Sequence, residues 1–190
     1  MKATCDYRVS FSTGGLFFYE SVEFARLHIP RESWSETRNR AVTARITQMP
    51  KDTSNSRSII EIKNRISTFS TIELEFFLDD ADRVDQKAML WIACCRVYRF
   101  VREFAVDVIR DRYVSYYDVL PPESFDVFFN DKTEENEDLT RIKKSTLLKL
   151  RQVLFRIMRE ADILTDQNEI KKSFLSLQLT SLIRDNNQAE

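Results

Sequence analysis

The chain has 190 residues, 43% of them apolar, and carries 29 Lys and Arg against 30 Asp and Glu for a net charge of −1. A chain of this length can bury an ordinary core, so we expect a single domain over residues 1–190, or two tightly packed lobes of about residues 1–80 and 81–190. Its two glycines, Gly14 and Gly15, are adjacent. Neither a G-x-G-x-x-G loop nor a Walker A loop can therefore be formed, which excludes nucleotide binding through those motifs.

Composition also favours an all-α protein. Four prolines and two glycines are few, and 31% of the residues are charged. Because β folds rich in turns need Gly, Asn and Pro at their corners, we expect a compact helical fold instead.

Cysteine and histidine are too scarce for most metal sites and for most catalytic sites that use these residues. The cysteines are Cys5, Cys94 and Cys95, the last two in an apolar setting that predicts buried thiols, and His28 is the one histidine. A zinc site would need an unusual ligand set, and a triad would depend on that single histidine. We therefore predict no enzyme activity, no metal, no cofactor and no small-molecule substrate.

Membrane insertion is also unexpected. The longest uncharged run in the most hydrophobic region is residues 88–95, far below the roughly 20 residues that span a bilayer. Asp6 and Arg8 interrupt the N-terminus, so no signal peptide is expected. These features predict a cytoplasmic protein without a membrane partner.

In chain order, alternating apolar residues predict an extended arm that ends at the Gly14-Gly15 turn. A first helix is expected over about residues 16–27, before Pro30. Ser33 is the expected N-cap of a second helix that ends at the Met49-Pro50 step. A third follows a polar turn, and its expected inner face is Ile59, Ile62, Ile66 and Phe69.

The second half of the chain continues the helical pattern. Ser70 and Glu73 form a capping-box pair before a helix over residues 71–78. The longest pattern, about residues 85–113, predicts a central helix that is kinked or broken near Arg99. A short helix through residues 125–129 should follow Pro121 and Pro122. Two amphipathic segments are expected next, over residues 145–164 and about 174–183, and residues 185–190 should fray.

Two surfaces have an excess of positive charge. Residues 31–70 contain eight Lys or Arg and four Asp or Glu, on two helices joined by a polar turn with the outline of a helix-turn-helix. Residues 141–159 contain seven Lys or Arg and no acidic residue. The neighbouring residues 121–140 contain seven acidic residues and one Lys. The two blocks could neutralise each other or separate into an acidic and a basic face.

Three sequence blocks resemble a known family. They are SFSTGGL at residues 10–16, LWIACCRVYRFVREFAVDV at residues 90–108, and KLRQVLFRIMREADIL at residues 149–164. The chain resembles, over about residues 7–182, the BrxA family of bacterial BREX phage-exclusion systems. The resemblance implies an all-helical cytoplasmic protein with a NusB-like helical arrangement. It also implies binding of double-stranded DNA within a multi-protein defence system that includes a DNA methyltransferase. It implies no catalytic residue. The inner-membrane label sometimes given to this family conflicts with the missing apolar span.

We therefore expect a DNA-binding component of a BREX system that acts through phosphate contacts, with other BREX components as partners. A docking subunit, using an apolar groove or the acidic residues 134–138, is the alternative; an RNA-binding NusB-like module is another. For any single cation, a solvated surface charge or an intrahelical ion pair is expected ahead of a DNA contact, so the prediction depends on the clusters. The candidate DNA contacts are Arg38, Arg40, Arg45, Lys51, Ser54, Asn55, Arg57, Lys63, Arg65, Lys143, Lys144, Lys149, Arg156 and Arg159.

Overall fold

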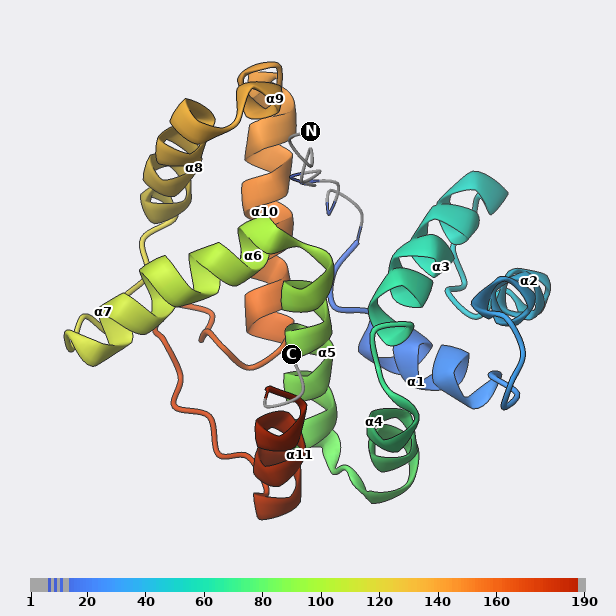
Figure 1. The fold of residues 1–190 in the computed structure, drawn as a ribbon. Helices are drawn as coiled ribbons and strands as arrows, with labels where there is room; N and C mark the ends of the chain where they lie inside the picture. The colour runs from blue at the N-terminus through green and yellow to red at the C-terminus, as the bar shows by residue number, and fades with distance from the viewer. Residues whose placement is uncertain (1–6, 8, 10, 12–13, 188–190) are drawn as a thin grey trace, which may run out of the picture.

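The computed structural model describes residues 7, 9, 11 and 14–187 and is all-α over those residues (Figure 1). The first helices are α1 (Phe18–Arg26), α2 (Trp34–Ala44), α3 (Asp52–Ile66) and α4 (Thr71–Glu75), the last continued by a wider π-helical turn, η1 (Phe76–Asp80). They gather on one side of the molecule. The predicted N-cap at Ser33 and the predicted capping box of Ser70 with Glu73 are confirmed, and Ser33 also forms a capping box with Glu36, which explains where α2 and α4 begin.

The second half contains α5 (Arg83–Val97), α6 (Arg99–Phe104), the π-helical η2 (Ala105–Arg110) and α7 (Asp111–Val114). It continues with α8 (Glu123–Glu135), α9 (Glu137–Thr140), α10 (Lys144–Glu160) and α11 (Leu177–Asn187). The predicted break near Arg99 is confirmed, because Tyr98 is extended between α5 and α6. The last helix begins at Leu177, later than the predicted segment of about residues 174–183, and the apolar residues Phe174 and Leu177 are exposed.

One hydrophobic cluster runs through both halves of the chain. In the first half, Ile59, Ile62 and Ile66 of α3 are fully buried, as predicted. In the second half, α10 buries an apolar stripe, and Phe100 packs against Phe125, Phe128 and Phe129 of α8. Figure 1 shows the N-terminal arm passing between α10 and α3. Residues of both halves of the chain therefore share one core.

The arm is packed into this core. Phe11 is fully buried and its ring lies 5.4 Å from that of Tyr98 and 6.1 Å from that of Phe100. Gly15 approaches α10 so closely that a Cβ there would lie 2.3 Å from the Glu160 carboxylate. The same carboxylate accepts a hydrogen bond from the backbone N–H of Leu16 at 2.6 Å. The glycine pair therefore allows the arm to contact α10.

Replacing Gly14 with alanine should lower the free energy of unfolding by about 1–2 kcal/mol. Gly14 has a φ of 74°, and a Cβ would lie 1.9 Å from the ring of Phe17, so both the backbone and the ring would be strained. Urea unfolding measures the effect. Ser35→Ala, at an exposed position of α2, is the control and should change stability by less than about 0.5 kcal/mol. Equal stability of the two variants would contradict the strain argument.

Candidate nucleic-acid interface

The connection between α2 and α3 is fixed by buried polar contacts. Thr47 Oγ1 donates to Asn55 Oδ1 at 2.6 Å, and Asn55 Nδ2 donates to the carbonyl of Val42 at 3.4 Å. Asn55 is only 3% exposed, so its assignment as a DNA contact is wrong. The connection runs from Arg45 to Lys51 and is longer than the 3–4-residue turn of a helix-turn-helix. The two-helix hairpin is present, but its connection differs from that motif.

Arg65 is also a structural residue. Its side chain is 0% exposed, and Nη1 donates to the carbonyls of Gly15 at 2.8 Å and Leu16 at 3.2 Å. A guanidinium in this position cannot reach a phosphate without unfolding of the arm. The sequence-based assignment of Arg65 as a DNA contact is therefore wrong.

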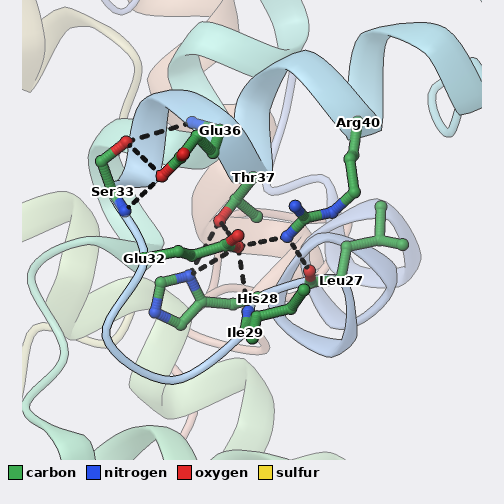
Figure 2. Close-up of polar contacts among 8 residues, drawn as sticks. All are labelled: Leu27, His28, Ile29, Glu32, Ser33, Glu36, Thr37 and Arg40. Carbon is green, nitrogen blue, oxygen red and sulfur yellow. Dashed lines mark hydrogen bonds and ion pairs between the residues drawn. The ribbon is translucent and has the colours of Figure 1, made fainter.

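Arg40 joins α2 to the preceding loop, as Figure 2 shows. Its Nη2 donates to the carbonyl of Leu27 at 2.6 Å and forms an ion pair with Glu32. Thr37 donates to the same carboxylate at 2.7 Å, and the ring of His28 lies 2.8 Å from the Thr37 hydroxyl. The hydrogen bond from Arg40 is the main cause that lowers the pKa of Glu32 to about 2.

The remaining candidates on α2 and α3 differ in accessibility. Arg38 is half-buried, and Arg45 is exposed but paired with Asp52 at 2.6 Å. Ser54 and Lys63 are half-buried. Lys51 and Arg57 are exposed and have no ion pair with any described residue, so these two are the free cations among the candidates of this segment.

The N-terminal part of α10 carries the second cluster. Lys143 is its N-cap and Lys144 its first residue, and both are exposed, as is Lys149 one to two turns further on. The first turn contains no acidic residue. Cations at this end are unfavourable, because the helix dipole and the free N–H groups make the N-terminus positive. Stability of the helix does not explain these lysines, whereas an anion would be bound favourably there.

The two arginines in the last part of α10 make contacts within the protein. Arg156 is exposed but pairs with Glu160, four residues on, at 2.6 Å. Arg159 is half-buried, donates from Nη2 to Asn168 Oδ1 at 2.8 Å and lies over the ring of Phe155. Arg159 therefore supports the loop after α10, and Arg156 is the more accessible of the two.

The acidic residues 121–140 do not cancel the basic helix. Among the described residues, ion pairs between the two blocks are limited to Arg141 with Asp138, at 3.5 Å, and Arg151 with Asp126. Lys143, Lys144 and Lys149 form none. These three lysines are therefore not neutralised by direct ion pairs with the acidic block.

A pocket of about 380 Å³, with Glu20 and Glu160 in its lining, lies beside Arg156. It is lined by Met49 from the α2–α3 connection, by Arg156 of α10, and by Arg83 and Lys87 of α5. Arg83 is exposed and donates to the hydroxyl of Tyr19 at 2.9 Å, while Lys87 pairs with Asp162. Sequence reasoning missed both residues, although their four-residue spacing puts them on one face of a helix.

Two other classes of site have no support in the part of the chain that the structure describes. Its His, Cys, Asp and Glu side chains form no group of three or more that could hold a metal ion. None of its helices combines the length and the apolar character needed to cross a bilayer. Cys94 is buried and Cys95 half-buried, in partial agreement with the prediction, and burial raises the pKa of both thiols; Cys5 lies outside the described residues.

Comparison with known proteins identifies the family. The family model described as BrxA matches residues 5–187, nearly the whole chain. The chain belongs to the BrxA family. A curated member, "BREX protein BrxA" from Bacillus cereus (strain H3081.97), is 28% identical over 106 residues, which are 54% of this BrxA-family chain and 53% of that protein. The alignment thus spans about half of the length of that relative.

A solved structure supports the BrxA-family fold. The crystal structure of an uncharacterized protein from Magnetospirillum magneticum superposes with a TM-score of 0.79 over 96% of this chain and 94% of that one. The two sequences are 21% identical, so the likeness concerns the fold alone.

Proposed function

We propose that this chain is a non-enzymatic, cytoplasmic component of a BREX phage-defence system that binds double-stranded DNA, mainly through phosphate contacts. The observation that carries the proposal is the exposed, unpaired cluster of Lys143, Lys144 and Lys149 at the positive end of α10. Phosphates would be bound there by lysine charge and by the helix N-terminus together. Family membership and the name of the Bacillus cereus relative support the defence role and other BREX components as partners.

The proposed interface is smaller than the sequence-based one. Its first part is the α10 cluster, with Arg156 further along the helix, and its second part is Lys51 and Arg57 on the α3 side. The pocket with Arg83 and Lys87 also contains Arg156 and adds two further cations to the proposed interface. Lysines and arginines that contact phosphates give affinity with little sequence information, so binding to unrelated duplexes is expected.

Three double charge reversals test this interface. Lys143→Glu with Lys144→Glu, and Lys51→Glu with Arg57→Glu, should each weaken binding of a duplex about tenfold or more. Lys172→Glu with Arg184→Glu, at exposed positions after α10 and on α11, changes the net charge equally and should change affinity less than about twofold. Fluorescence anisotropy with a labelled duplex gives the affinities, and circular dichroism checks the fold.

The salt dependence provides a second criterion. Log affinity should fall linearly with log salt, with a slope of about 0.9 per phosphate contacted, and each interface variant should reduce that slope. Equal losses in all three double variants would contradict the assigned surface, and affinity independent of salt would contradict phosphate binding. Single-stranded DNA and RNA compete in the same assay, and preference for RNA would favour the alternative RNA-binding function.

A further inference from the structure

An apolar groove with an acidic rim lies between α8 and the helix formed by η2 and α7. Its volume is about 600 Å³, and its apolar lining includes Val108 of η2 and Val127 and Phe128 of α8. Val127 is 60% exposed, so the floor of the groove is open to a ligand. Figure 1 shows α7 and α8 on the side of the molecule away from α1, α2 and α3. The groove is thus separate from the α3 part of the proposed DNA interface.

The rim is acidic and its carboxylates are unpaired. Asp107, Asp111, Glu123 and Asp131 line the groove and are all exposed. None of the four has a hydrogen bond or ion pair through its carboxylate with another described residue. Unpaired carboxylates around an apolar floor attract a ligand that is both cationic and apolar.

The two cations in the groove are already engaged. Lys132 pairs with Glu103 at 3.0 Å and with Glu135 at 3.7 Å. Arg112 Nε donates to the carbonyl of Val119 at 2.9 Å, and its guanidinium lies over the ring of Tyr117. Lys132 also attracts the carboxylate of Asp107, but neither cation forms an ion pair with the rim, which leaves a net negative charge for a partner.

Exposed apolar side chains extend from the groove. Arg112 and Val127 line it, and beyond Arg112 the chain exposes Val114, Tyr116, Tyr117 and Val119 at 67%, 89%, 65% and 49%. Contiguous exposed aromatic and aliphatic residues beside a polar rim are typical of protein–protein interfaces, where Tyr is enriched. These residues follow the groove residue Arg112 in the chain and add exposed apolar side chains to this part of the molecule.

We propose that this groove binds a basic amphipathic segment of a different protein. Its apolar side chains would lie on Val108, Val127 and Phe128, and its Lys or Arg side chains would meet the four carboxylates. Nucleic acid is disfavoured because the carboxylates repel phosphates. A second copy is disfavoured because a two-fold contact would place one acidic rim against another.

A synthetic peptide provides the test. The probe has about 18 residues, with Leu and Lys at the spacing of an amphipathic helix, and the comparison peptides have Glu in place of Lys or the same residues in scrambled order. The full chain should bind the amphipathic Lys peptide, measured by fluorescence anisotropy. Equal binding of the scrambled peptide would overturn the proposal.

Matched variants locate the binding. Asp111→Lys with Asp131→Lys should weaken peptide binding about tenfold or more, and Val127→Ser about fivefold. Glu134→Lys with Glu137→Lys, exposed acids that do not line the groove, should change binding less than about twofold. A loss of equal size in this control would overturn the proposal, as would unchanged binding in the groove variants when thermal unfolding shows that they are folded.

Two further measurements distinguish peptide binding in the groove from binding at the lysine cluster of α10 and from self-association. The variant with Lys143→Glu and Lys144→Glu should keep its affinity for the peptide, because those residues do not line the groove. Sedimentation of the unmodified chain should show no self-association that the groove variants remove. If the unmodified chain self-associates and the groove variants do not, a second copy occupies the groove and the proposal is wrong.

Discussion

Replacing Arg65 with alanine should lower the free energy of unfolding by about 3–5 kcal/mol, the largest effect expected in this chain. The side chain is 0% exposed and donates to the carbonyls of Gly15 and Leu16. Removal leaves a cavity and removes a charged donor from two carbonyls in the interior. Glu160 binds the other side of the same arm through the Leu16 N–H, so Arg65 also helps to connect α3 with α10.

Arg57, two turns earlier on α3, is the matched control because it is exposed and unpaired among the described residues. Arg57→Ala should change stability by less than about 0.5 kcal/mol and should weaken DNA binding. Urea unfolding should show a large loss of stability in Arg65→Ala and almost none in Arg57→Ala. Anisotropy should show weaker DNA binding in Arg57→Ala. If Arg65→Ala were as stable as the unmodified chain, the structural role of Arg65 would be refuted.

Local signals in the sequence were sufficient to predict most helix positions. Ser33 and Ser70 begin α2 and α4 because each side chain caps the N–H of a glutamate three residues on, a contact within a single turn. The long helical pattern over about residues 85–113 also predicted a kink or break near Arg99, and Tyr98 is extended there. Helix periodicity depends on near neighbours, so a single sequence is enough to detect it.

The role of each cation could not be predicted in the same way. Arg40, Arg57 and Arg65 all appear as polar positions on amphipathic helices, yet one forms a loop contact, one is free and one is buried. Arg65 contacts residues 49 and 50 positions away in the chain. Periodicity identifies the polar face of a helix, but it does not show which other segment covers that face.

The three blocks that carry the family resemblance meet in space. Gly15 and Leu16 of the first block contact Glu160 of the third, and Phe11 packs on Tyr98 and Phe100 of the second. They describe how the arm is packed, and they contain few of the free cations. The resemblance therefore identified the family, whereas the candidate interface was inferred separately from the two segments rich in Lys and Arg.

Glu103→Gln should lower the free energy of unfolding at pH 7 by about 2–3 kcal/mol. Tyr7 of the arm donates to Glu103 Oε2 at 2.6 Å, Lys132 of α8 lies 3.0 Å from the same oxygen, and Arg99 donates to Oε1 at 2.5 Å. Partial burial alone would raise the pKa of this carboxyl. The hydrogen bonds from Tyr7, Lys132 and Arg99 outweigh it and lower the pKa from 4.5 to about 2.

The sign of the pH dependence follows from this shift. A carboxyl whose pKa is lower in the folded state stabilises the fold above its unfolded pKa, and the stabilisation is lost as the pH falls toward the folded value. The stability difference between the unmodified chain and Glu103→Gln should therefore be constant above about pH 5 and shrink between 4.5 and about 2. Urea unfolding at a series of pH values measures it, with Asp107→Asn, an exposed carboxylate one turn further on, as the control. A difference that stays constant down to pH 2 would show that Glu103 stabilises the arm through packing and not through its charge.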